Sequence, residues 1–94
     1  MKTVVIIHNI NSRGKNINED YVRELLNKKG IKFHYFQTQK ISDVDEIIKK
    51  YNNPSEFQYC SIGGDGSLNA LINSLMNNKI TMPEVSCLPG GSGS

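Results

Sequence analysis

Four short apolar runs alternate with three amphipathic segments along this chain of 94 residues, and few folds accommodate that order. The first run, residues 3–7, is a continuous β-branched stretch of the kind found in parallel strands that are buried on both faces. The other runs cover residues 31–37, 57–62 and 85–88. The resulting order, β-α-β-α-β-α-β, predicts an α/β fold with three layers, in which a mainly parallel sheet carries helices on both faces.

Each predicted helix has an apolar stripe at helical spacing. We expect the first helix to begin near Glu19 and to end at Gly30, the second to be capped by Ser42, and the third to begin at Ser67. The stripe of the second helix comprises Val44, Ile47, Ile48 and Tyr51, and that of the third comprises Leu68, Leu71, Ile72, Leu75 and Met76.

The size and charge of the chain exclude several classes of protein. Its 94 residues suffice for one small domain, and a net charge of +2 without a basic stripe gives no indication of nucleic-acid binding. No apolar run is long enough for a signal peptide or a membrane span. Cys60 and Cys87 lack the spacing of a zinc site or a disulfide scaffold, so we expect both to be buried strand thiols in a reducing compartment. We therefore expect a cytoplasmic protein whose contact with membranes, if any, is peripheral.

Two glycine-rich elements follow predicted strands directly. They are residues 63–69 (Gly-Gly-Asp-Gly-Ser-Leu-Asn) and residues 89–94 (Pro-Gly-Gly-Ser-Gly-Ser). Glycine lets a phosphate approach the backbone closely, and successive N–H groups that lead into a helix bind anions. The polar loop at residues 9–15 and Thr38 also follow strands, and the carboxyl ends of parallel strands share one edge of the sheet. These segments therefore predict a nucleotide site at that edge.

Two familiar phosphate-binding motifs are excluded. A Walker loop ends in Gly-Lys-Ser/Thr, whereas Gly14 and Lys15 are followed by Asn16. A dinucleotide fingerprint requires Gly-x-Gly-x-x-Gly after the first strand, whereas the glycines here follow the third strand and Asn69 stands where the last glycine is needed. What remains is a cradle of backbone amides and hydroxyl groups around an acidic residue.

That acidic residue is Asp65, at the centre of the first glycine element. In phosphoryl transfer to a hydroxyl group, its carboxylate could bind Mg²⁺ indirectly, accept the proton of the hydroxyl or orient the loop. Alternatively, it could form an Asx turn that caps the helix beginning at Ser67. The spacing alone leaves these alternatives open.

Around Asp65 the sequence resembles a known family. Ile62-Gly63-Gly64-Asp65-Gly66-Ser67-Leu68-Asn69, followed by Asn73, is similar to the GGDGT-L-N-x-x-x-N signature of the diacylglycerol kinase catalytic domain, a family that includes sphingosine, ceramide and bacterial lipid kinases. Residues 9–15 resemble its first-strand loop, Asn-Pro-x-Ser-Gly-Lys, and Thr38 falls where the family has a threonine after its second strand. Residues 88–93 resemble its Pro-x-Gly-Thr/Ser-x-Asn-Asp loop. The four matches occur in the family's order and span the chain.

The resemblance implies that residues 1–94 form an N-terminal domain of the kind shared by diacylglycerol kinases and NAD kinases, with ATP and Mg²⁺ as cofactors. It implies a catalytic role for Asp65, as general base toward a lipid hydroxyl, and leaves the metal ligands unassigned. The residues implied to bind ATP are Asn9, Asn11, Ser12, Gly14, Thr38, Gly63, Gly64, Asp65, Gly66, Ser67, Leu68, Asn69, Gly91 and Ser92.

The sequence departs from the family pattern at several points. Ile10 replaces the loop proline, Arg13 adds one residue to that loop, Ala70 stands where many bacterial members have glutamate, and Ser94 takes the place of an asparagine. The family's second, β-rich domain, which forms much of the lipid site, is absent from the sequence. We therefore expect the nucleotide-binding part of a longer lipid kinase, with little or no kinase activity by itself.

Other functions stay open at this point. An NAD-kinase-like enzyme shares the Gly-Gly-Asp-Gly turn, although the Pro-Gly-Gly-Ser-Gly element one strand later favours the lipid kinases. A non-catalytic nucleotide-binding module would keep the cradle without the lipid domain. Residues 90–94 would also suit an artificial glycine-serine linker, although Leu88 and Pro89 before them match the family's loop.

Overall fold

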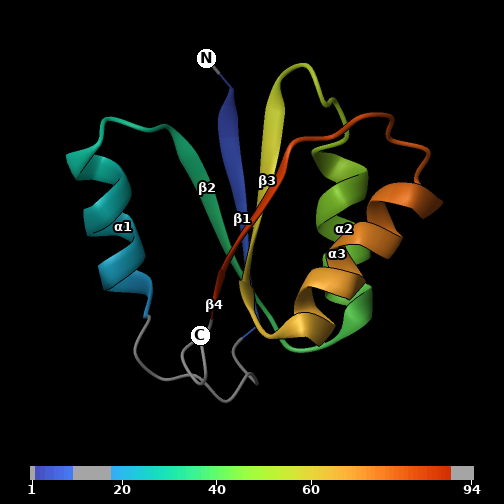
Figure 1. The fold of residues 1–94 in the computed structure, drawn as a ribbon, viewed down its shortest axis with the longest axis horizontal. Coiled ribbons are helices and arrows are strands. Elements are labelled where there is room, and N and C mark those ends of the chain that lie inside the picture. Colours follow the sequence, from blue (N-terminus) through green and yellow to red (C-terminus); the bar gives the residue numbers. More distant parts are fainter. Residues whose placement is uncertain (1, 10–17, 90–94) are drawn as a thin grey trace.

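The sheet has the parallel arrangement that the sequence predicts (Figure 1). The computed structural model describes residues 2–9 and 18–89, and within them four strands lie side by side in the order β2-β1-β3-β4. All three strand pairs are parallel. The strands are β1 (Thr3–Asn9), β2 (Phe33–Thr38), β3 (Phe57–Gly63) and β4 (Val85–Pro89), and the helices are α1 (Glu19–Lys28), α2 (Ile41–Lys50) and α3 (Asp65–Asn77).

Helices cover both faces of the sheet, with α1 on one side and α2 and α3 on the other (Figure 1). Because successive strand residues point to opposite faces, β1 contributes to two separate cores. Val4 and Ile6 belong to the core beneath α1, whereas Val5 and Ile7 belong to the core beneath α2 and α3. All four are at most 7% exposed. The prediction of a three-layer α/β fold around a strand buried on both faces is therefore confirmed.

All four strands continue further than the apolar runs indicate. β1 extends to Asn9 and β2 to Thr38, and these two residues are partners in the parallel register. β3 extends to Gly63, which is the register partner of Pro89. The carboxyl ends of all the strands lie at one edge of the sheet, the lower edge in Figure 1. Asn9 and Thr38 therefore bring polar side chains to the edge of the sheet at which a ligand site is expected.

α2 begins before its predicted cap. The helix starts at Ile41 with Lys40 at the N-cap position, so the prediction that Ser42 caps it is wrong. The Asp43 carboxylate accepts hydrogen bonds from the backbone N–H groups of Gln39, at 3.0 Å, and Lys40, at 3.2 Å. These bonds, first that from Gln39, hold the pKa of Asp43 below its ordinary value, because they stabilise the ionised form. A carboxylate in the first turn thus replaces the expected serine cap.

α3 begins at Asp65, two residues before its predicted start. Its predicted apolar face is only partly correct. Leu71 and Leu75 are buried, but Ile72 is 38% and Met76 is 68% exposed. The side of α3 that carries these exposed residues is not covered by any of the described elements, so hydrophobic spacing alone overestimated the width of the buried stripe. The stripe of α2 is confirmed, with Val44, Ile47, Ile48 and Tyr51 all in or against one core.

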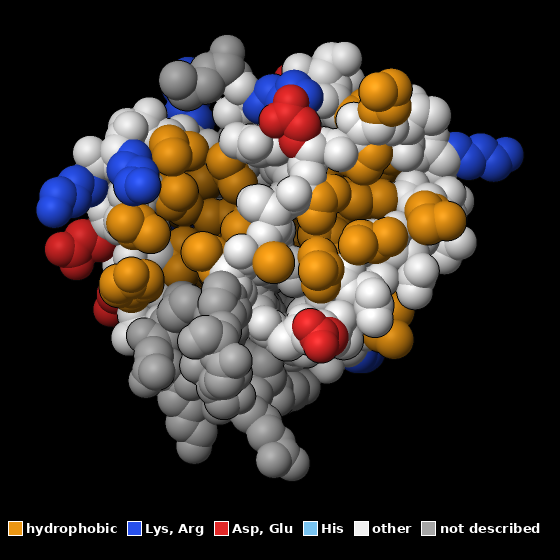
Figure 2. All heavy atoms as spheres, viewed as in Figure 1, with side chains coloured by type: hydrophobic (Ala, Val, Ile, Leu, Met, Phe, Trp, Pro, Cys, Tyr) orange, Lys and Arg blue, Asp and Glu red, His pale blue; other side chains and the backbone are white. Residues whose placement is uncertain are grey.

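β4 is an edge strand, and its side chains are the least covered of the sheet. Val85 is 37% exposed, and Cys87 is exposed while Cys60 is buried. The expectation of two buried thiols is therefore wrong for Cys87, because no element of the described structure packs on that part of β4. In Figure 1, β4 crosses the centre of the view. In Figure 2, hydrophobic side chains are visible at the surface on either side of that central region. No helix within the described ranges has the length and apolar content that a membrane span requires.

A polar cluster joins α2 to α3. The Asp45 carboxylate accepts hydrogen bonds from Asn78 Nδ2 and Ser74 Oγ, both at 2.9 Å, and lies 3.2 Å from Lys49 Nζ. The bonds from Asn78, Ser74 and Lys49 hold the pKa of Asp45 below its ordinary value. Because Ser74 is only 4% exposed, its hydroxyl depends on this partner. The cluster therefore holds α3 against α2. It thereby helps to position the first turns of both helices at the edge of the sheet.

Replacing Asp45 with alanine should destabilise the chain and remove part of its sensitivity to acid. The variant leaves the buried Ser74 hydroxyl without its acceptor, so we expect Tm to fall by several degrees. A carboxyl whose pKa is lowered on folding stabilises the protein above its unfolded pKa of about 3.8, and this contribution is lost as the pH falls through the lower folded value.

Thermal unfolding of wild type and Asp45→Ala from about pH 7 down to about pH 2 measures this effect. The wild-type curve should fall more steeply in the acid range than that of the variant. Glu46→Ala, an exposed carboxylate on the same helix, is the control and should follow the wild type. Parallel acid transitions in wild type and Asp45→Ala would contradict the prediction.

Candidate functional site

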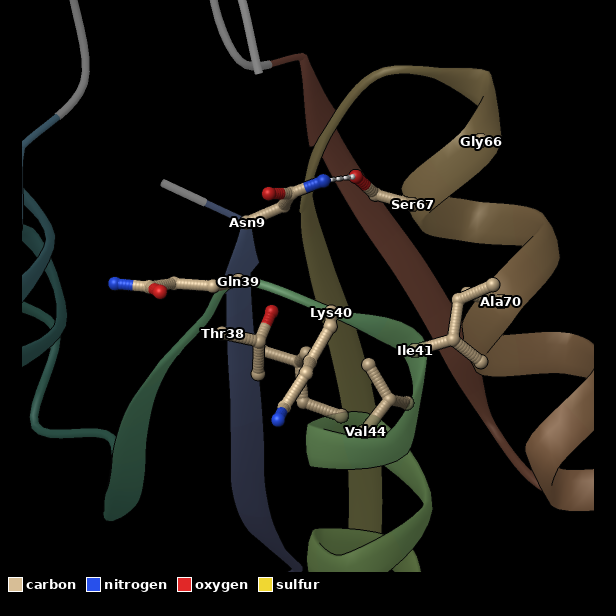
Figure 3. A pocket seen from close by; sticks show the side chains of 10 residues that line it. Asn9, Thr38, Gln39, Lys40, Ile41, Val44, Gly66, Ser67 and Ala70 are labelled. Carbon is tan, nitrogen blue, oxygen red and sulfur yellow. Dashed lines mark hydrogen bonds between the residues drawn. The ribbon is translucent and has the colours of Figure 1, made fainter. Parts of the chain in front are cut away.

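A cavity of about 100 Å³ opens at the carboxyl ends of β1 and β2, at the edge where the sequence predicts a nucleotide site (Figure 3). The N-terminal turns of α2 and α3 contribute the rest of its walls. Its lining residues are Ile7, Asn9, Thr38, Gln39, Lys40, Ile41, Val44, Gly66, Ser67 and Ala70. Ligand pockets usually measure about 300–1,000 Å³, so this cavity is smaller than most of them.

Three predicted polar side chains meet at this cavity from three different elements. Asn9 Nδ2 donates a hydrogen bond to Ser67 Oγ at 3.0 Å, which joins the end of β1 to the first turn of α3 across 58 residues of sequence. Thr38, the register partner of Asn9, is 3% exposed. Figure 3 shows its hydroxyl oxygen on the side of the cavity toward Asn9. The arrangement presents one amide and two hydroxyl groups, all able to donate hydrogen bonds to a ligand oxygen.

The backbone at Gly63 explains why the first glycine element needs glycine at this position. Its φ of 151° lies in a region that L-residues rarely adopt. A Cβ atom there would lie 2.8 Å from Ser67 Cβ and 3.5 Å from Asn9 Cβ, against the two residues whose side chains are hydrogen-bonded to each other. Gly64, by contrast, has a φ of −96° and open space around its Cβ position. Gly63 thus allows the close approach of strand end and helix start.

Asp65 is the first residue of α3, and it is exposed. The alternative in which it caps this helix through an Asx turn is excluded, because the N-cap residue is Gly64 and no side chain provides a cap. The N–H groups of Ser67 and Leu68 bond to the Gly64 carbonyl instead. A carboxylate in the first helical turn is favoured by the helix dipole. Asp65 does not line the cavity, but it directly precedes Gly66 and Ser67, which do.

The remaining predicted residues fall into two groups. Gly64 and Asn69 are exposed, Leu68 is half-buried, and none of them lines the cavity. The predicted residues Asn11, Ser12, Gly14, Gly91 and Ser92 lie outside the part of the chain that the structure describes.

Lys40 lines the cavity although the sequence analysis did not single it out. It follows Thr38 by two positions, so the argument that selects residues at strand ends could have selected it too. Ile7, Ile41, Val44 and Ala70 supply an apolar wall. Lys40 is the charged residue among the described lining residues, and none of these is acidic. Such a lining suits an anionic ligand with an apolar part.

The described residues form no metal centre of their own. Within residues 2–9 and 18–89, no group of three His, Cys, Asp or Glu side chains is placed to hold a metal ion. Mg²⁺ is often bound in proteins by one or two carboxylates together with phosphate oxygens. The glycine element at residues 63–69 contains one carboxylate, that of Asp65, so the described residues assign no set of metal ligands.

Comparison with known protein families identifies the chain. The profile of the diacylglycerol kinase catalytic domain matches residues 3–94. The chain belongs to this family. Among curated proteins none matches it. A diacylglycerol kinase catalytic domain is a kinase-type catalytic domain, and the match includes β1, Thr38 and the first turn of α3, all of which contribute residues to the cavity lining.

Proposed function

We propose that this domain binds ATP with Mg²⁺ and serves in the transfer of the γ-phosphoryl group to the hydroxyl of a diacylglycerol-like lipid. The observation that carries the proposal is the meeting of Asn9, Thr38 and Ser67 at one cavity in a chain of the diacylglycerol kinase catalytic-domain family. Their amide and hydroxyl groups can donate hydrogen bonds to phosphate or ribose oxygens. A cradle of amide and hydroxyl groups can bind phosphates without the lysine that a Walker loop provides.

Charge at the site supports an anionic ligand. The first turn of α3 follows two consecutive glycines, and the free N–H groups of a helix start favour phosphate. Lys40 adds a cation to the cavity lining. Bound with the nucleotide, Mg²⁺ would neutralise charge on the transferred phosphoryl group.

In this proposal Asp65 is the general base. The lipid hydroxyl oxygen bonds to the γ-phosphorus, the bond from that phosphorus to the β–γ bridging oxygen breaks, and ADP leaves. The proton of the lipid hydroxyl passes to the Asp65 carboxylate. The exposure of Asp65 leaves it accessible to a large substrate.

The rest of the proposal concerns the parent protein. Residues 1–94 would be its nucleotide-binding domain, and the lipid would be bound largely by a β-rich domain outside this sequence. The protein would be cytoplasmic and would contact the membrane peripherally, because a diacylglycerol-like substrate resides there. The family resemblance of the sequence is the support for these points.

Labelled ATP tests the proposal. The chain should bind Mg·ATP saturably, and the protein that carries it should transfer the γ-label to organic-extractable lipid when diacylglycerol vesicles are supplied. Label found in NADP instead would favour an NAD-kinase-like enzyme. ATP binding with no transfer to either acceptor would favour a non-catalytic module, and absence of ATP binding would contradict all three.

Replacing Thr38 with valine should weaken ATP binding by about tenfold, as expected for the loss of one hydrogen bond of about 1.4 kcal/mol. Valine has the shape of threonine but lacks the hydroxyl, so this buried site keeps its packing and Tm should change little. Calorimetric titration with Mg·ATP measures the affinity. The matched control is Thr81→Val, at an exposed position away from the cavity lining, and it should bind as the wild type does. If Thr38→Val and Thr81→Val bound Mg·ATP with equal affinity, Thr38 would not contribute a hydrogen bond to ATP.

A further inference from the structure

A hydrogen-bonded pair of side chains joins β1 to β2 on the face of the sheet that α1 covers. His8 Nδ1 and Tyr35 Oη are hydrogen-bonded, and the two rings meet edge to face. His8 is only 6% exposed, although it lies near the end of its strand. Gln37 Nε2 also donates to Tyr35 Oη, at 3.4 Å.

The tautomer of His8 sets the direction of its bond to Tyr35. An amide nitrogen can only donate, so Gln37 takes one lone pair of the Tyr35 oxygen, and the Tyr35 hydroxyl donates to His8 Nδ1 when that nitrogen carries no hydrogen. In that arrangement His8 is neutral, with its proton on Nε2. Protonation at Nδ1 would place a second hydrogen between the two atoms, and Tyr35 would have to turn its own hydrogen away from its acceptor. Protonation therefore reverses this bond and places a positive charge at a position that is only 6% exposed, which is unfavourable.

This link lies directly behind the cavity. His8 is the register partner of Gln37, and the next pair along the two strands is Asn9 with Thr38. Because successive residues point to opposite faces, the link and the two cavity residues occupy opposite faces of the same two strand ends. Bonds on one face limit how far the ends can separate or slide. They thereby limit the spacing of Asn9 and Thr38 on the other face.

We propose that His8 and Tyr35 are positioning residues for nucleotide binding: their hydrogen bond holds the ends of β1 and β2 at the spacing that Asn9 and Thr38 need, and protonation of His8 weakens this hold by placing a charge in a buried position. The proposal rests on the ATP site proposed above. Neither His8 nor Tyr35 lines the cavity, so their effect on the ligand passes through the strand ends.

The surroundings of His8 favour its neutral form. Burial lowers the pKa of His8 below its ordinary value of 6.5. The ionisable neighbours of the pair are Tyr35 itself, Glu19 and Arg23 of α1, and Cys60 in the same core; the Arg23 guanidinium lies 5.6 Å from the Tyr35 ring centre. Since the unfolded chain binds the His8 proton more readily, stability falls as the pH drops below 6.5 toward the lower folded pKa. ATP affinity should fall over the same interval.

Variants of the full chain test this role by their Mg·ATP affinity at several pH values. Tyr35→Phe removes the hydroxyl and should bind Mg·ATP roughly three- to tenfold more weakly at about pH 8, with less pH dependence. His8→Asn offers an amide near the position of Nδ1 that does not titrate. It should keep the wild-type affinity within about twofold at about pH 8 and show no decline down to about pH 5.5. The exposed controls Tyr21→Phe and His34→Asn should keep both the affinity and the pH profile.

Two outcomes would overturn the positioning role: equal ATP affinity of Tyr35→Phe and wild type, or a wild-type pH profile in His8→Asn. If the wild-type chain binds no ATP, the proposed function fails, and NMR decides the role of the link separately. His8 must then show an unprotonated Nδ1, and amide exchange at Asn9 and Thr38 must accelerate in Tyr35→Phe but not in Tyr21→Phe. Unchanged exchange at these two residues would overturn the role.

Discussion

Replacement of Gly63 by alanine is expected to lower the free energy of unfolding by about 2–4 kcal/mol, the sum of backbone strain and overpacking. The strain arises because the φ of 151° at Gly63 is one that alanine rarely adopts. The overpacking arises because the new Cβ would lie 2.8 Å from Ser67 Cβ. Since Ser67 is bonded to Asn9, the hydrogen bond at the cavity should be lost as well, and ATP binding with it. Urea unfolding measures the stability, and titration with Mg·ATP measures the binding.

The neighbouring glycine provides a matched control. Gly64→Ala introduces the same methyl group one residue later, where φ is −96° and nothing lies within 4 Å of the added atom. Because Gly64 is the N-cap residue of α3, where glycine is preferred over alanine, this substitution should lower the free energy of unfolding by no more than about 1 kcal/mol. If Gly63→Ala were as stable as Gly64→Ala, the close approach of β3 to α3 would not depend on glycine.

Replacement of Asp65 by asparagine is expected to reduce kcat at least about 100-fold in the kinase that carries this domain, which is the usual effect of losing a general base. Asparagine has nearly the same size but cannot accept the proton of the lipid hydroxyl. Because Asp65 does not line the cavity, ATP affinity should remain within about threefold of the wild-type value. Initial rates with saturating ATP and lipid measure kcat, and titration measures the affinity.

Asp20→Asn is the control for the charge of a helix start, since Asp20 is an exposed aspartate in the first turn of α1. It should retain the wild-type kcat. A parallel loss of activity in both variants would point to a general electrostatic effect. Full activity of Asp65→Asn would show that Asp65 is not the general base.

The fold could be predicted because the hydrophobic pattern of the strands differs clearly from that of the helices. The continuous run of residues 3–7 left no hydrophilic face, and the structure buries β1 on both sides. The helix starts were predicted less well, because short-range capping competes with tertiary contacts. Asp43 replaced Ser42 as the capping side chain of α2. Exposure on α3 and β4 could not be predicted from spacing, since it depends on which neighbouring elements are present.

The candidate site was predicted through the rule that ligands bind at the carboxyl ends of parallel strands. That rule brought together Asn9, Thr38 and Ser67, which are far apart in sequence, and the structure places all three at one cavity. Lys40 was missed because a single lysine in a polar connection has no distinctive pattern. The His8–Tyr35 link was missed because hydrogen bonds between side chains of neighbouring strands depend on register, which the sequence does not specify.

The cavity is formed by side chains that come together only in the folded sheet. A ligand bound there binds the folded chain but not the unfolded one, so folding and ligand binding are parts of one coupled equilibrium. A ligand at about 100 times its Kd would add about 2.7 kcal/mol to the free energy of unfolding. The thermodynamic stability of this domain is then a function of the ligand concentration around it, and marginally stable variants would remain folded wherever that concentration is high.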